Sequence, residues 1–539
     1  VIRRIAHKII DFLAQLEDFQ KKLWLKKKFV VETSYCIRLG VIPEEFYPEI
    51  AANDAQREEW VRLFAIDEIK GDLTKPGYSV PLKVEFLKAH PSLTVDTRHF
   101  DKSFENRVLN AISDLDKSTD AVLLHSENFH ALRLLACRYE ASVDCVYTDP
   151  PFNTAATEIL YKNEYKHSSW LSLIRDRTLE AVGLMKTSAA FCMAIDDAEH
   201  SRLIECLCGE LGEDKHLATV PVRSNPHGRA MAAGFSVNHE YALFWGISDK
   251  VSVGRLPRDE DRMSRYPYRD EKGAFTWINF RKTGADSRRV DRPKLFYPIY
   301  VRADGSVRVP SMKWSDREGW IALEAPGNDE TEVWPIDSDG VERVWTLGVE
   351  RAREEVETEC EAKLNSGTWQ VYRKYRPNVE GALPGTWWDL AKYSATESGT
   401  KAIIDLFGKR EIFSYPKSIY LVEDCLRVLG CRPNTTVLDY FAGSGTTGHA
   451  TINLNRDDGG KRKFVLIEQA DYFDTVLLPR LKKVTFTPEW KDGKPKRLAT
   501  AEEAERSPRI MKVIRLESYE DTLNNLELRR TEAQQSLLD

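Results

Sequence analysis

The chain contains 539 residues, which is more than one ordinary hydrophobic core holds and indicates two to four structural units. Its hydrophobic content of 42% is typical of globular proteins, and no apolar run reaches the roughly 18–20 residues of a membrane span, so we expect no membrane partner. The net charge of −6 does not by itself indicate a nucleic-acid-binding protein. The nine cysteines are scattered, which is typical of reduced thiols in a cytoplasm, and Cys206-x-Cys208 lacks a second pair, so we predict no metal site.

Residues 1–115 are expected to form a helical N-terminal region. Apolar residues recur at helical spacing between residues 5 and 23, and a second helical stretch lies near residues 55–64. Packing against the rest of the protein is the simplest role for the first helix, and self-association is the alternative.

Strands and helices alternate from residue 121 onward. Strands are predicted at 121–124, 143–147, 189–195 and 241–245, and helices at 127–139, 170–185 and 197–207. This alternation is typical of a mainly parallel α/β sheet, and we assign residues 116–250 to it.

The alternation stops between residues 251 and 385, where short β-like runs and one charged helix, at 347–364, replace it. Residues 251–320 carry 16 Lys and Arg against 10 Asp and Glu, with aromatic residues between them. Local basicity of this kind suits a surface that contacts phosphates, although a solvated arginine-rich surface explains it equally well. The α/β pattern returns over 386–490, with a helix at 418–429 and strands at 436–440 and 463–467, and a C-terminal extension follows at 491–539.

A glycine-rich turn follows the strand at 436–440 and reads Phe441-Ala-Gly-Ser-Gly-Thr-Thr447. Glycine permits positive φ and a close backbone approach, and the small hydroxyl residues of such a turn cap a helix or bind a ligand. The next strand delivers Glu468 about twenty residues later, where a carboxylate suits the ribose hydroxyls of a nucleoside. A phosphate-binding P-loop is excluded because no lysine follows the glycines. Lys417, at the start of the preceding helix, is a candidate partner for a cofactor carboxylate.

The segment Asp149-Pro150-Pro151-Phe152 follows the strand at 143–147. At the carboxyl end of a strand, a carboxylate and a rigid prolyl carbonyl form a pair of acceptors that suits an amino group, and the phenylalanine ring can stack on a base. An amine inside a duplex is reached only when its base is rotated out of the helix. A proline-rich loop without function is the alternative.

Together these segments resemble the motifs of DNA amino-methyltransferases. The Asp149–Phe152 segment resembles motif IV, residues 441–445 resemble motif I, Glu468 falls at the motif II acid, and residues 415–418 are similar to motif X. Motif IV before motif I marks the β class, and aspartate in the first position of motif IV resembles the adenine N6 enzymes. The sequence segments at 24–29, 386–389 and 399–401 resemble segments of the modification subunit of type III restriction-modification systems or of a solitary relative.

The resemblance implies a Rossmann-like, mostly parallel, doubly wound sheet with residues 251–385 as an inserted target-recognition domain. It implies an adenine-specific DNA methyltransferase (EC 2.1.1.72) of a bacterial or archaeal cytoplasm, which uses S-adenosylmethionine and acts on double-stranded DNA. A restriction subunit with helicase and nuclease activity and a second copy of the chain are implied partners. Cytosine N4 methylation and a DNA-recognition subunit with a silent methyltransferase site are the alternatives.

The resemblance also assigns roles to single residues. Asp149 and the Pro150 carbonyl would hold the adenine amine beside Pro151, and Phe152 would stack on the base. Residues implied at the cofactor are Asp439, Phe441, Gly443, Ser444, Gly445, Thr446, Glu468 and, more weakly, Lys417. Candidates for DNA contact are Arg281, Lys282, Arg288, Arg289 and Arg292, which would meet phosphates or guanine edges. The chain begins with Val1 rather than methionine, so we expect it to be part of a longer protein.

Overall fold

The computed structural model describes residues 2–71, 76–154, 166–230, 234–257, 265–365, 367–377 and 381–525. The chain divides into two compact units. The first contains residues 1–256 together with 383–539, and the second contains residues 257–382. None of the helices within the described residues is both long and apolar enough to cross a membrane.

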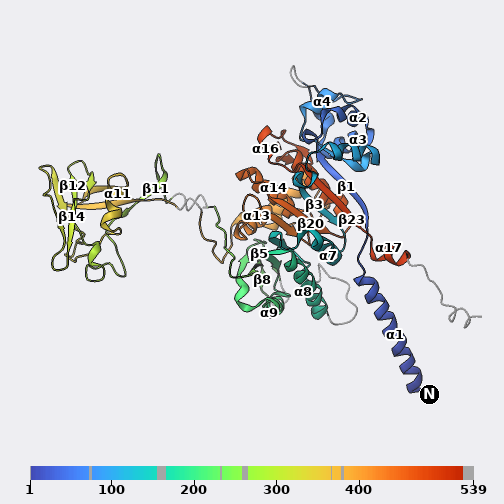
Figure 1. Ribbon diagram of the computed structural model, residues 1–539, viewed down its shortest axis with the longest axis horizontal. Coiled ribbons are helices and arrows are strands. Elements are labelled where there is room, and N and C mark those ends of the chain that lie inside the picture. The colour runs from blue at the N-terminus through green and yellow to red at the C-terminus, as the bar shows by residue number, and fades with distance from the viewer. Residues whose placement is uncertain are drawn as a thin grey trace, which may run out of the picture. The chain divides into compact units, whose positions relative to one another are not determined.

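The first unit is built on a ten-stranded sheet with the order β2-β1-β23-β3-β20-β19-β4-β5-β9-β6. In chain order the strands are β1 (Val30–Arg38), β2 (Thr94–Asp96), β3 (Thr119–His125), β4 (Val143–Thr148), β5 (Met185–Ile195), β6 (His216–Val222), β9 (Glu240–Gly246), β19 (Thr436–Asp439), β20 (Lys463–Glu468) and β23 (Ile510–Leu516). The strands from β23 to β5 pair in parallel, and the outer pairs at both edges are antiparallel. Strands β3, β20 and β23 are visible side by side in Figure 1.

Helices cover both faces of this sheet. The helices of the first unit are α1 (Ile2–Leu25), α2 (Tyr47–Ala52), α3 (Asp54–Phe64), α4 (Val84–Ala89), α5 (Lys102–Ala111), α6 (Leu115–Ser118), α7 (Asn128–Tyr139), α8 (Lys166–Leu184), α9 (His200–Leu211), α12 (Lys401–Phe407), α13 (Ile419–Val428), α14 (Thr446–Asp458), α15 (Leu478–Phe486), α16 (Ala501–Glu505) and α17 (Tyr519–Asn524), with π-helices η8 (Ala395–Thr400) and η9 (Phe473–Leu477). Side chains that alternate along each strand point into two different cores. Helices α13, α14 and α15 share one core and α7, α8 and α9 the other.

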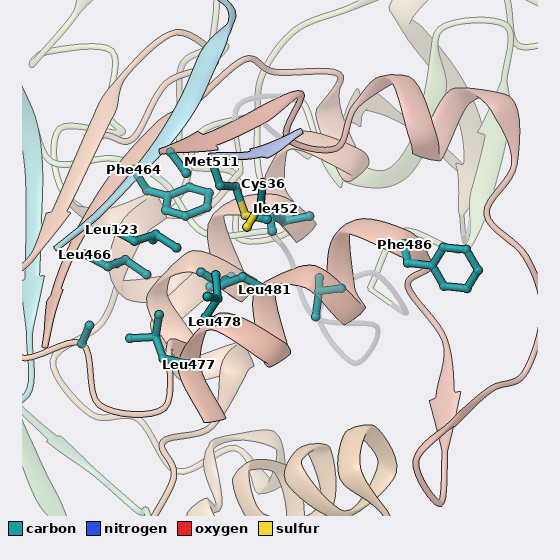
Figure 2. Packing of buried hydrophobic residues seen from close by; sticks show 14 of the residues in the cluster. Cys36, Leu123, Ile452, Phe464, Leu466, Leu477, Leu478, Leu481, Phe486 and Met511 are labelled. Atoms are coloured by element: carbon teal, nitrogen blue, oxygen red, sulfur yellow. The ribbon is translucent and has the colours of Figure 1, made fainter. Parts of the chain in front are cut away.

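Figure 2 shows the first of these cores, where Leu123 and Leu466 of the sheet lie opposite Leu478 and Leu481 of α15. The next residue along each strand, such as Leu124 or Ile467, points into the other core. A parallel sheet with helices on both faces is the doubly wound arrangement that the alternation of elements predicts.

Both ends of the first unit add strands that the sequence pattern did not reveal. The N-terminal region is mainly helical, but β1 and β2 join the sheet. The C-terminal extension contributes β23, which lies between β1 and β3. The N-terminal region and the C-terminal extension therefore both contribute strands to the central sheet.

The second unit has its own core, formed around Phe280, Tyr297, Trp345 and Val356. Its strands are β10 (Tyr268–Asp270), β11 (Gly273–Asn279), β12 (Ile299–Arg302), β13 (Val307–Arg308), β14 (Met312–Ser315), β15 (Gly319–Ala322), β16 (Glu330–Val333), β17 (Cys360–Asn365) and β18 (Thr368–Tyr375), which pair antiparallel in small sheets. The charged helix expected at 347–364 is shorter, because α11 ends at Glu359 and β17 follows at once.

Candidate functional site

Three carboxyl groups lie at the carboxyl ends of neighbouring parallel strands. Asp149 follows β4, Asp439 ends β19 and Glu468 ends β20, and β19 lies between the other two strands. All three line one cavity of about 830 Å³, together with residues 413–417. Open α/β sheets bind ligands at the carboxyl ends of their strands. This cavity is lined both by the segment that begins at Asp149 and by the glycine turn.

The loop that begins at Asp149 is held in place by hydrogen bonds to residues outside it. The indole nitrogen of Trp170, on α8, donates to the Pro151 carbonyl over 2.7 Å. Asn153 has a positive φ of 59° and donates to the buried carboxylate of Glu199. The Pro150 carbonyl has no hydrogen-bond partner among the described residues. The loop therefore holds one carbonyl in place and leaves the neighbouring carbonyl free to accept.

Asp149 lies beside a buried ion pair. The Lys417 ammonium is 3.3 Å from Asp149 Oδ1 and 2.7 Å from Glu240 Oε2, and it lies 4.4 Å from the centre of the Phe152 ring. Burial raises the pKa of Asp149 to about 6, although Lys417 opposes the shift. Lys417, which was expected at a cofactor carboxylate, lines the cavity and pairs there with two carboxylates of the protein.

The glycine turn has the conformation that its residues predict. Gly443 and Gly445 have positive φ angles of 54° and 80°, and α14 begins directly after Gly445. A Cβ atom on Gly445 would lie 3.2 Å from Leu477 Cγ, so this position is restricted by space as well as by backbone conformation. Only glycine adopts this geometry without strain.

The hydroxyl groups of the turn do not cap α14. The buried Arg480 of α15 donates to Ser444 Oγ over 2.8 Å and to Thr446 Oγ1 over 3.0 Å. Burial lowers the pKa of Arg480 to about 9, and no carboxylate in the described part of the chain forms an ion pair with it. The turn is thus braced against α15, with Ser444 and Thr446 at the wall of the cavity.

Asp439 and Glu468 hold the turn from its other side. Asp439 accepts from the Phe441 amide over 3.0 Å and from the Thr447 hydroxyl, and burial raises its pKa to about 7 despite these bonds. Glu468 accepts from the amides of Gly443, Gln469 and Ala470 over 2.8–3.0 Å. Burial raises the pKa of Glu468, while these amides oppose the shift. Phe441 also lines the cavity.

Several residues of the site lie outside the acceptor segment and the glycine turn. Glu240 and Tyr147 line the cavity, and Glu240 Oε1 and the Tyr147 hydroxyl are buried without a hydrogen-bond partner among the described residues. Trp24, at the end of α1, also lines the cavity and packs against His130. Tyr147 lies on the predicted strand just before Asp149, and this proximity is the one signal that pointed to it.

The five basic candidates for DNA contact all lie in the second unit. Arg281 donates to the Ile336 carbonyl, Lys282 to the Asp286 carbonyl, Arg289 pairs with Glu342 at 3.1 Å, and Arg292 lies 3.6 Å from Asp286. Arg288 is exposed, and no side-chain partner for it occurs among the described residues. These residues are grouped in one segment of the unit, and none of them belongs to its buried hydrophobic core.

Residues 143–476 match the family described as DNA methylase (N6_N4_Mtase), and this match spans both halves of the cavity. The chain belongs to this family. Its activity is therefore the transfer of a methyl group to DNA. The family as described covers both N6 and N4 methylases.

Individual relatives are similar over most of the chain. The type II methyltransferase M.KpnI of Klebsiella pneumoniae is 30% identical over 371 residues, which cover 67% of this chain and 83% of the relative. The Mod subunit of the type III restriction-modification enzyme EcoPI, from Escherichia phage P1, is 26% identical over 81% of this chain and 70% of its own length. Among solved structures, the M1.HpyAVI–SAM complex aligns with a TM-score of 0.30 and 15% identity, over 67% of this chain and 99% of that one.

Proposed function

We propose that the chain transfers a methyl group from S-adenosylmethionine to the N6 amine of an adenine that has been rotated out of double-stranded DNA. The observation that carries this proposal is the pair of acceptors on one loop, the Asp149 carboxylate and the Pro150 carbonyl, which has no hydrogen-bond partner among the described residues. Phe152 belongs to the same loop, and all three residues line the cavity.

An exocyclic amine has two N–H groups, and the two acceptors match them. Hydrogen bonds to both N–H groups fix the plane of the amine and direct its lone pair along one line. Stacking of the base on Phe152 would contribute roughly 1–3 kcal/mol. As the nitrogen gains a methyl group it becomes more acidic, and one of its protons passes to the Asp149 carboxylate, which is the nearest base.

The cofactor half of the cavity fits a nucleoside. A volume of about 830 Å³ lies within the usual range for small-molecule sites, and the cavity reaches from Asp149 to the glycine turn. Gly443 lines the cavity and allows close approach to the backbone, and Glu468 would accept from the ribose hydroxyls. When bound, S-adenosylmethionine supplies the electrophilic methyl group.

Adenine is the proposed target because aspartate opens the acceptor segment and because the chain is similar to type III Mod subunits. By the same similarity we propose that the second unit, within the expected range of 251–385, reads the DNA sequence. A restriction subunit and a second copy of the chain are the proposed protein partners.

The proposal is tested with Asp149→Ala. Wild-type protein and the variant are incubated with DNA and tritiated S-adenosylmethionine, and the labelled nucleosides are separated after nuclease digestion. We expect N6-methyldeoxyadenosine from the wild type and at least about a 100-fold lower rate from the variant, because it has lost an acceptor and a base. Cofactor binding measured by calorimetry should change little.

Asp176→Ala, an exposed substitution on α8, is the matched control and should keep wild-type activity. Label recovered in N4-methyldeoxycytidine would show that cytosine, and not adenine, is the target base. Full activity of Asp149→Ala would contradict the assigned chemistry.

A further inference from the structure

One lysine contacts every protein group that is proposed to hold the target base except the Pro150 carbonyl. Lys417 Nζ lies 3.3 Å from Asp149 Oδ1, 2.7 Å from Glu240 Oε2 and 4.4 Å from the centre of the Phe152 ring. These partners come from the loop after β4 and from the start of β9, whereas Lys417 precedes α13. The side chains of Lys417 and Glu240 are each 10% exposed, so water screens their interaction poorly.

The Glu240–Lys417 contact is a fixed anchor. Glu240 Oε1 has no partner among the described residues, so its carboxylate has Lys417 as its closest cation. Burial lowers the pKa of Lys417, but Asp149 and Glu240 outweigh burial and raise it above its ordinary value. The lysine therefore stays charged, and one positive charge is shared between two carboxylates.

We infer that Lys417 is a positioning residue, anchored by Glu240, that keeps the Asp149 carboxylate charged and directed at the target amine. This inference rests on the proposed function of Asp149 as an acceptor. It differs from the role that motif similarity implies for Lys417, which is a contact with the cofactor.

The arrangement gives the two partners of Asp149 opposite effects. The positive charge of Lys417 lowers the pKa of Asp149, and the negative charge of Glu240 raises it. The charge of Asp149 in turn raises the pKa values of Asp439 on β19, Tyr147 on β4 and Tyr472 before η9. Those three groups are unchanged by substitutions at 417 and 240, so they do not alter the direction of either effect.

The experiment measures kcat/KM for DNA against pH in the full-length protein, because this profile reports ionisations of the free enzyme. In Lys417→Met the acidic limb should move to higher pH by roughly one to three units, the range for a carboxyl that loses an adjacent cation. In Glu240→Gln, which keeps an oxygen for Lys417, the acidic limb should move to lower pH. Lys417→Arg keeps the charge and should lie close to the wild type.

General damage to the fold would not produce shifts of opposite sign, so the pair of variants separates electrostatics from structure. Calorimetry with S-adenosylmethionine gives the second measurement, and Lys417→Met should bind it within a few-fold of the wild type. Weaker cofactor binding with an unmoved pH profile would overturn the inference in favour of a cofactor contact. If Lys417→Met does not fold, an unmoved or upward-shifted limb in Glu240→Gln overturns it. A wild-type protein that does not methylate DNA would instead refute the proposed function.

Discussion

At the scale of single residues, three acids at neighbouring strand ends differ because their partners differ. Asp149 lies beside the Lys417 ammonium and accepts no hydrogen bond from a backbone amide of the described residues, so its oxygens are available to an incoming amine. Both carboxylate oxygens of Asp439 accept hydrogen bonds, from the Phe441 amide and the Thr447 hydroxyl, and so stabilise the turn. Glu468 accepts from three backbone amides and also lines the cavity, so it joins the turn to the proposed ribose position.

Glu468→Gln tests this double role. Glutamine replaces one acceptor oxygen by an NH2 group, which cannot accept from the Gly443, Gln469 or Ala470 amides. A lost hydrogen bond to a charged group costs roughly 1.5–3 kcal/mol, so we expect S-adenosylmethionine to bind at least about tenfold more weakly by calorimetry. Asp149→Asn is the matched control and should bind the cofactor normally. Equal affinities in both variants would exclude Glu468 from the cofactor site.

The sequence predicted the residues of the site whose signal is local and missed those whose signal is not. Asp149 and Glu468 each follow an apolar strand within a few positions of a diagnostic turn, so they could be found by reading along the chain. The Lys417–Glu240 contact joins positions 177 residues apart and depends on the order of strands in the sheet. The pattern of residue types along the sequence does not specify the order of strands in the sheet. The partner of Lys417 was therefore not predictable.

At the scale of elements, the start of α14 depends on a left-handed glycine. Alanine at 445 would place a Cβ atom 3.2 Å from Leu477 Cγ and would hold φ near 80° against its own preference. Strain of this kind costs about 1–3 kcal/mol. We expect Gly445→Ala to lower the midpoint of thermal unfolding and to weaken cofactor binding.

Gly209→Ala is the control for that substitution. Gly209 lies within α9 with nothing near its missing Cβ, so alanine should raise stability by about 0.5–1 kcal/mol. Calorimetric melting and cofactor titration of both variants check the prediction, and a Gly445→Ala protein with wild-type cofactor affinity would contradict it.

The parallel centre of the fold was predictable, and the edge to which β1 and β23 contribute was not. Apolar runs separated by helices form the strands β3, β4, β5, β19 and β20. This alternation predicts a parallel α/β sheet. Strand β1 begins with two exposed residues, and β23 contains the charged residues Lys512 and Arg515 and lies in a charged segment. Neither strand is therefore a clear apolar run. They support each other only after the two ends of the chain meet, with Thr33 opposite Ile514.

At the scale of the whole molecule, the chain interrupts one sheet domain with a second unit. The acceptor half precedes residues 257–382 and the turn half follows them, so both must fold back together before the cavity exists. The second unit has its own hydrophobic core. This separation suits a protein in which chemistry and sequence reading reside on different parts of the chain.

The basic segment of the second unit gives the last prediction. If Arg288 and Arg292 contact phosphates, their replacement by glutamine should weaken DNA binding and should reduce the slope of log K against log salt by roughly 0.9 for each lost contact. Arg351→Gln, an exposed change on α11 of the same unit, removes one charge and should leave the slope unchanged. Cofactor binding should not change in any of these variants, because each described residue that lines the cavity belongs to the first unit. Binding is measured by fluorescence anisotropy at several salt concentrations, and a double variant with the wild-type slope would place the DNA-contacting surface elsewhere.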